Sequence, residues 1–272
     1  MECALGESYV LPGVSGWHAF GSTPTRLYCF AHAGGTASKV FQKWREALAP
    51  QVQVVPIDLP GRGALTSERV IGDYEALVER LSDKLTEDLR SALDFGSCPS
   101  YAIFGHSAGA RFGFAAAVRA AARIGREPSH CFLSAAAPFS AAPRERRRSH
   151  LSDDEWLTEL QTLGGTPSHL LADESLMSIV LPVLRADFCA VEGSHVDAGL
   201  RLGCPLTLIA ADRDAYVSAN GVWEWSRYTS ASCRKVLLRG DHFSVLSGEG
   251  PLLDAIQDGL AFDDDSFWPS AF

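Results

Sequence analysis

Three residues that could together carry out acyl transfer follow one another along the chain: Ser107, Asp214 and His242. Ser107 stands at the centre of residues 105–109, which read Gly-His-Ser-Ala-Gly and match the pattern G-x-S-x-G. A serine hydroxyl is a weak nucleophile at neutral pH, so it needs a nearby base that a carboxylate orients. The pattern therefore predicts a serine nucleophile, a histidine base and an orienting aspartate.

Two aspartates compete for the orienting role, because Asp212 and Asp214 both follow an apolar segment that ends at Ala211. Asp214 is favoured because its position leaves room for the loop to turn and present a carboxylate to His242. Asp212 is then expected to act as a turn or capping residue. Of the eight histidines, only His242 follows the last predicted strand, where the base is needed.

Acyl transfer also needs N–H donors for the oxygen that becomes negative in the transition state. One candidate is the backbone N–H of Ala108, directly after the nucleophile. The second is the N–H of Ala33, in the His-Ala-Gly-Gly segment of residues 32–35, which is similar to the H-G-G-G type of loop. His32 itself is expected to brace this loop, although a catalytic role for it is the alternative.

The elements that must position these groups alternate along the chain. Residues 101–104 form an apolar, partly aromatic segment typical of a buried strand, and the Ala-rich residues 110–124 indicate a helix. A strand, G-x-S-x-G and a helix in this order make a nucleophile elbow, a tight turn that lifts the serine above the sheet. Glycines are expected at 105 and 109 because side chains there would clash where strand and helix pack closely.

The remaining pattern extends this arrangement to the whole chain. Further strands are predicted at 27–30, 52–57, 131–133, 205–211 and 235–238, and helices at 40–48, 74–89, 222–228 and 252–260. Strands that alternate with helices imply a mostly parallel central sheet with helices on both faces. We therefore expect one α/β domain over residues 1–272, with the α/β-hydrolase fold.

One region interrupts the alternation. Between Pro138 and Gly203 the chain has only helical patterns, which predicts a helical insertion over about 139–203. An insertion of this length between two strands suggests a lid over the elbow. The alternative is a structural helical excursion without a gating role.

Composition excludes several classes of partner. Lys and Arg number 24 against 33 Asp and Glu, and the net charge of −9 argues against nucleic acid or an anionic membrane. The seven cysteines are scattered and contain no C-x-x-C pair. This pattern is typical of reduced thiols in a cytoplasmic protein, and it argues against a disulfide framework or a zinc site. Neither a signal peptide, a membrane span nor a nucleotide-binding glycine fingerprint is apparent, so we expect a cytoplasmic protein without metal or cofactor.

Taken together, the motifs resemble the type II thioesterases that accompany nonribosomal peptide and polyketide synthases. The resemblance spans nearly the whole sequence, and its most discriminating part is the segment of residues 181–188, which generic hydrolases lack. The other matching segments are residues 30–35, 59–62, 105–110, 212–214 with Val217, Trp225 with Thr229, and 240–243. Two positions depart from the family: Ala108 stands where Met is usual, which leaves more space, and Asp241 where Gly is frequent.

The resemblance implies a catalytic triad of Ser107, Asp214 and His242 and an oxyanion hole at Ala33 and Ala108. It also implies hydrolysis of acyl groups from the phosphopantetheine arm of acyl or peptidyl carrier proteins, an editing role in antibiotic biosynthesis. We further expect the protein to be a monomer. Product release and hydrolysis of ordinary carboxylic esters are the alternatives within the same chemistry. A non-enzymatic binding module is disfavoured, because all three members of the triad are present.

Four further residues bear on substrate delivery. Arg144, Arg146, Arg147 and Arg148 lie where the chain enters the predicted lid. By residue type they form a solvated face. The alternative is a local basic patch that docks an acidic carrier protein despite the negative charge of the whole chain. Arg62, in the Pro-Gly-Arg-Gly turn, is expected to be structural and not to bind substrate.

Overall fold

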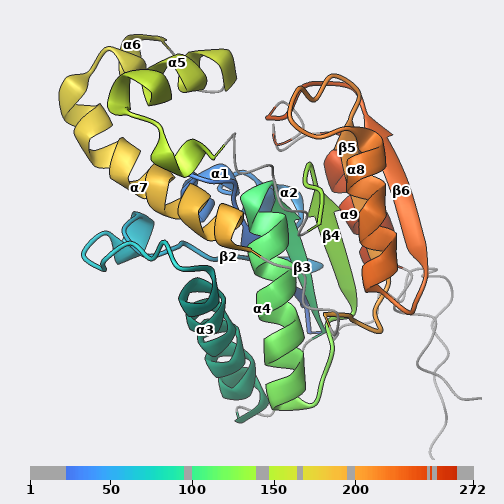
Figure 1. Ribbon diagram of the computed structural model, residues 1–272. Helices are drawn as coiled ribbons and strands as arrows, with labels where there is room; N and C mark the ends of the chain where they lie inside the picture. Colours follow the sequence, from blue (N-terminus) through green and yellow to red (C-terminus); the bar gives the residue numbers. More distant parts are fainter. Residues whose placement is uncertain are drawn as a thin grey trace, which may run out of the picture.

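A central parallel sheet organises the chain in the computed structural model, which describes residues 23–94, 100–138, 147–163, 168–194, 200–243, 246 and 250–261. Within these residues the sheet has six strands in the order β2-β1-β3-β4-β5-β6 (Figure 1). Every pair of neighbouring strands is parallel, so the carboxyl ends of all strands meet at one edge. The strands are β1 (Thr25–Phe30), β2 (Val52–Pro56), β3 (Tyr101–His106), β4 (His130–Ser134), β5 (Leu206–Ala211) and β6 (Cys233–Leu238).

Helices cover both faces of the sheet, because side chains on these strands are apolar on both sides. Along β1, Tyr28 and Phe30 pack into one buried cluster, whereas Leu27 and Cys29 pack into another, as the two-residue period of a strand requires. The first cluster is closed by α3 (Tyr74–Asp94), α4 (Ala108–Ile124), α8 (Ala219–Trp223) and the 3-10 helix η4 (Glu224–Tyr228). The second is closed by α1 (Ala37–Val40), α2 (Trp44–Ala47) and α9 (Pro251–Ala261). The α/β-hydrolase fold predicted from the sequence is thereby confirmed.

Two predicted helices differ in detail from the observed ones. The pattern over 40–48 predicts a single helix, but the chain forms α1 and α2 with a turn between them. Phe41 and Trp44 are nevertheless both fully buried and pack on each other and on Phe104, so the apolar residues of the predicted helix still face the core. The predicted helix over 222–228 is divided in the same way between α8 and η4.

Three helices form a separate layer at the carboxyl edge of the sheet: α5 (Asp153–Leu163), α6 (Ser168–Leu171) and α7 (Glu174–Gly193). Figure 1 shows α5 and α6 beside the outer end of α7, which runs back toward α4. A small apolar cluster holds the three together, with Trp156, Leu160 and Leu171 packed against residues of α7. No helix among the described residues has the length and apolar character that crossing a membrane requires.

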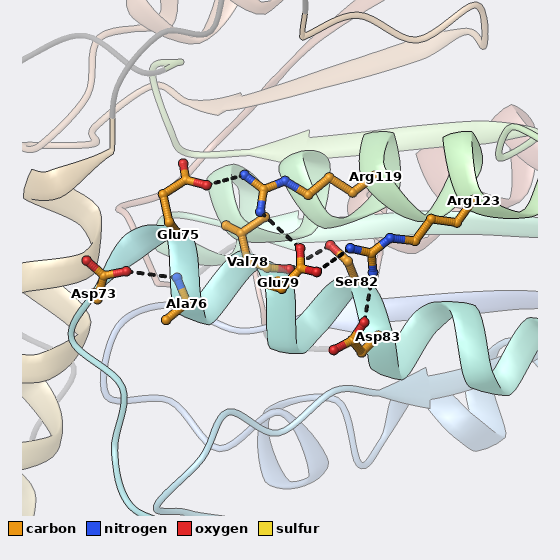
Figure 2. A network of polar contacts seen from close by, with 9 residues as sticks. All are labelled: Asp73, Glu75, Ala76, Val78, Glu79, Ser82, Asp83, Arg119 and Arg123. Atoms are coloured by element: carbon orange, nitrogen blue, oxygen red, sulfur yellow. Dashed lines mark hydrogen bonds and ion pairs between the residues drawn. The ribbon is translucent and has the colours of Figure 1, made fainter.

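An ion-pair network joins α3 to α4 on the outer surface. Arg119 contacts Glu75 and Glu79, and Arg123, one turn further along α4, contacts Glu79 and Asp83 (Figure 2). Since the carboxylates are half exposed, each pair contributes little to stability. The network lies outside the site described below.

Candidate active site

The turn between β3 and α4 holds Ser107 in a strained conformation. Its backbone has φ 55° and ψ −121°, a positive φ that non-glycine residues rarely adopt and that costs about 1–3 kcal/mol. Close packing on either side of the serine requires glycine: a Cβ on Gly105 would lie 2.4 Å from the Cα of Ala110, and one on Gly109 would lie 2.3 Å from the carbonyl oxygen of Phe30. The turn therefore has the geometry expected of a nucleophile elbow.

The loops after β5 and β6 bring an aspartate and a histidine together. The Nδ1 of His242 lies 2.7 Å from Oδ2 of Asp214, whose side chain is fully buried. The other oxygen of Asp214 accepts the N–H groups of Tyr216 and Val217 at 2.8 and 3.1 Å, which fixes the carboxylate in place. Asp212 is more exposed and accepts the N–H of Gly240 at 2.8 Å, a loop contact of the kind expected for it.

Ser107 and His242 line one cavity of about 680 Å³. Ala33 and Ala108, the two predicted oxyanion donors, line it as well. The opposite wall comes from the helical layer and is mostly apolar, with Leu160 from α5 and Met177, Val180, Leu184, Phe188 and Val191 from α7. The cavity thus places an apolar acyl-sized space directly beside the serine.

A buried ion pair connects the helical layer to the loop that carries Ala33. Both oxygens of Asp187 on α7 lie 2.6 Å from the guanidinium of Arg62, and Oδ2 also accepts the N–H of Gly34 at 2.6 Å. The two side chains are 2% and 6% exposed, respectively, so the pair is almost fully removed from water. The contact agrees with the structural role expected for Arg62. Asp187 was noted only as part of a matching segment, because a contact across 125 residues leaves no local signal.

Two further histidines lie beside His242 and are held neutral. His106 is fully buried with Nδ1 3.0 Å from the Ser134 hydroxyl, and its ring centroid is 5.1 Å from that of His242. Burial, with smaller effects of His242 and His32, lowers the pKa of His106 well below its ordinary value. Burial, followed by the charges of His242 and Arg62, lowers the pKa of His32 to about 4. A neutral His32 that packs edge-on against Phe243 suits the loop-bracing role expected for it.

The arginines predicted near the lid differ in what the structure describes of them. Arg144 and Arg146 lie outside the described residues, so the suggested basic patch is seen only in part. Arg148 lines the cavity and pairs with Glu159 at 2.5 Å, so it is not simply a solvated side chain. Sequence reasoning missed Arg111, which also lines the cavity. Its position four residues after Ser107 on an adjoining helix was the signal that could have found it.

Within the described part of the chain, no group of three or more His, Cys, Asp or Glu side chains is arranged to hold a metal ion. The parallel sheet, the strained serine turn and the Asp–His pair after β5 and β6 define the class of the molecule as an α/β-hydrolase.

Comparison with known proteins narrows this class. The family model described as the thioesterase domain matches residues 25–260, so the chain belongs to the thioesterase family. It is an enzyme that hydrolyses thioesters.

Two relatives and one solved structure illustrate the similarity. The protein named linear gramicidin dehydrogenase LgrE, from Brevibacillus parabrevis, is 34% identical over 86% of this chain and 87% of its own. Thioesterase PikA5 of Streptomyces venezuelae is 33% identical over 90% of this chain and 84% of its own. The structure of the type II thioesterase BorB from the borrelidin biosynthetic cluster is 30% identical, with a TM-score of 0.70 over 88% of this chain and 93% of that one.

Proposed function

We propose that the protein is a stand-alone type II thioesterase that edits a nonribosomal peptide or polyketide synthase. Its substrates are acyl groups attached through a thioester to the phosphopantetheine arm of an acyl or peptidyl carrier protein. The names of PikA5 and of BorB, a type II thioesterase of a biosynthetic cluster, support this substrate class. The name of LgrE describes a dehydrogenase, but this chain lacks the G-x-G-x-x-G fingerprint of dinucleotide binding.

The observation that carries the proposal is the 2.7 Å contact between His242 Nδ1 and Asp214, in a cavity that Ser107 shares. The contact directs the other ring nitrogen of His242 away from Asp214 and leaves it to act as the base. His242 takes the proton of the Ser107 hydroxyl as the serine oxygen attacks the thioester carbonyl. The C–S bond then breaks, the thiolate leaves as a thiol with that proton, and an acyl-enzyme remains.

Water completes the reaction by the same route. His242 takes a proton from water, the hydroxide attacks the acyl-serine, and the carboxylic acid leaves as the serine regains its proton. Asp214 stabilises the imidazolium through its contact with His242 Nδ1. The N–H groups of Ala33 and Ala108 are the proposed donors to the oxyanion in both steps, a role worth about 3 kcal/mol per donor in related chemistry.

The helices α5 to α7 are proposed to act as a lid, because they supply the apolar wall of the cavity while the sheet loops supply the polar groups. We also propose that the enzyme works as a cytoplasmic monomer without a metal or cofactor. The cytoplasmic location is supported by the cysteines, since all five that the structure describes are free thiols.

The proposal is tested by comparing hydrolysis of an acyl group carried on holo carrier protein with hydrolysis of the same acyl group as a p-nitrophenyl ester. A carrier-dependent editing enzyme is expected to have the higher kcat/KM on the carrier substrate. Preference for the p-nitrophenyl ester would favour a carboxylesterase instead. A second assay with a correct, full-length product and a short misloaded acyl group distinguishes editing from product release.

A further inference from the structure

Arg111 occupies an unusual place for a charged side chain. It lies on α4 four residues after Ser107, about one helical turn along the axis, and it lines the same cavity as Ser107 and His242. Burial lowers the pKa of the Arg111 guanidinium, yet an arginine remains protonated under all ordinary conditions. A permanent positive charge therefore stands in the wall of the cavity beside the nucleophile.

No described carboxylate balances this charge. Arg111 Nε donates to the carbonyl oxygen of Ala137 at 3.0 Å, and Nη1 donates to the Ser194 hydroxyl at 3.5 Å. Both acceptors are neutral, and among the described residues Arg111 forms no ion pair. The guanidinium also carries more N–H donors than these two acceptors satisfy. Part of the guanidinium therefore has no partner among the described residues.

The other arginines nearby have partners. Arg148 lines the cavity as well, but it pairs with Glu159 and lies over the ring of Phe188. Arg119, two turns further along α4, faces the outer surface and pairs with Glu75 and Glu79 (Figure 2). Of the described residues that line the cavity, none is an aspartate or a glutamate. Among the described residues, the cavity wall therefore has a positive charge that no carboxylate balances.

We propose that Arg111 selects acyl groups that carry a carboxylate, and that the substrates of this enzyme include short dicarboxylic acyl thioesters. A cation that no described carboxylate pairs with, set beside apolar side chains, favours binding of an anion over binding of a purely alkyl group. A guanidinium binds a carboxylate through two parallel N–H···O bonds, which adds orientation to attraction. The inference rests on the proposed function, because it takes Ser107 as the residue that attacks the acyl carbonyl.

The test compares acyl groups of equal shape and different charge. N-acetylcysteamine thioesters of malonate, succinate and glutarate are paired with those of 3-methylbutanoate, 4-methylpentanoate and 5-methylhexanoate, in which an isopropyl group replaces the carboxylate. The quantity measured is the ratio of kcat/KM for the anionic member to that for the neutral member. The series also reports the distance from the thioester carbonyl at which Arg111 binds.

The variant Arg111→Gln removes the charge but keeps an N–H donor for the Ala137 carbonyl. Its ratio is expected to fall roughly 10- to 100-fold for at least one chain length, which is the value of a hydrogen bond to a charged group. Hydrolysis of the neutral member is expected to change by less than about threefold. Arg119→Gln is the matched control on the same helix, and it is expected to leave the ratio unchanged.

Three results would overturn the inference: an unchanged ratio in Arg111→Gln at all three lengths, an equal loss on both members of each pair, or, when the same acyl groups are also assayed on holo carrier protein, a loss confined to the carrier-bound substrates. The second would mean that Arg111 only braces the Ala137 loop. The third would mean that it binds the phosphate of the phosphopantetheine arm, which these thioesters lack. If Arg111→Gln fails to fold, the wild-type ratios decide, with a neutral preference at all three lengths counting against the inference. Failure of the proposed function is distinguishable, because the wild type would then prefer the p-nitrophenyl ester to the carrier-bound acyl group, whatever the ratio in Arg111→Gln.

Discussion

Replacing Asp187 with asparagine should separate two roles of one buried contact. The Asp187 carboxylate is 2% exposed, neutralises Arg62 and holds the N–H of Gly34, the neighbour of the proposed oxyanion donor Ala33. Asparagine keeps the shape but loses the charge and one acceptor oxygen. Breaking a buried ion pair from one side costs roughly 3–5 kcal/mol, because the other charge stays buried without a partner.

The same substitution should also slow catalysis. Loss of an entire oxyanion donor lowers kcat by about 10²–10³ in related enzymes, and a loop displaced by loss of one anchor should lose a part of that. We therefore expect kcat for a neutral acyl thioester to fall roughly 10- to 100-fold, which is less than the loss of a whole oxyanion donor would cause. Urea denaturation measures the change in the free energy of unfolding, and steady-state kinetics measures kcat.

Two further variants make this reasoning refutable. Glu68→Gln breaks the exposed pair with Arg80 and should cost less than about 1 kcal/mol. The double variant Arg62→Met/Asp187→Leu replaces the buried pair with apolar groups, so it should recover much of the stability while kcat stays low, because Gly34 still lacks its acceptor. A loss of stability in Asp187→Asn as small as that of Glu68→Gln, or wild-type kcat in the double variant, would refute the argument.

Two other predictions follow from the titratable groups. Asp214→Asn should lower kcat by about 10⁴ because the wrong imidazole tautomer is then held, whereas Asp212→Asn should cost less than tenfold; the reverse order in steady-state kinetics would exchange their roles. Burial, followed by the charge of Arg234, lowers the pKa of His130 in the folded protein to about 4, so the unfolded chain binds a proton first as pH falls below about 6.5. Stability is therefore lost toward acid, by about 2 kcal/mol between pH 7 and pH 5 for this residue. His130→Gln should remove that part of the pH dependence of the unfolding free energy, measured by urea denaturation at the two pH values. An unchanged pH dependence would show that His130 binds its proton equally well in the folded and unfolded states, which would contradict the lowered pKa.

The fold could be predicted from the sequence because its signals are local. The strands contain short apolar runs, the residues proposed for the site follow shortly after β3, β5 and β6, and parallel strands bring those ends to one edge. Asp214 and His242 therefore meet although 28 residues separate them. The strained turn at Ser107 was predictable for the same reason, since Gly105 and Gly109 flank it in the sequence.

The contacts that depend on packing between distant segments could not be predicted. Nothing near Arg62 in the sequence indicates Asp187, and nothing near Arg111 indicates that its guanidinium donates to Ala137 and Ser194. The division of the predicted helix 40–48 into α1 and α2 could not be predicted either. The helical spacing of apolar residues continues through the turn at Phe41, although the backbone there is not helical. Tertiary packing decides such features, and periodicity alone does not encode them.

The central claim is that Ser107 carries the acyl group during hydrolysis of a carrier-bound thioester. The most direct measurement mixes the enzyme with carrier protein that bears an acyl thioester and quenches the reaction rapidly with acid. The peptides of the enzyme are then mapped by mass spectrometry. The wild type is expected to show the acyl mass on the peptide that contains Ser107. Ser107→Ala is expected to show no adduct and to lose several orders of magnitude in turnover while remaining folded. An acyl group on another residue, or a Ser107→Ala variant that retains most of its thioester hydrolysis, would contradict the account.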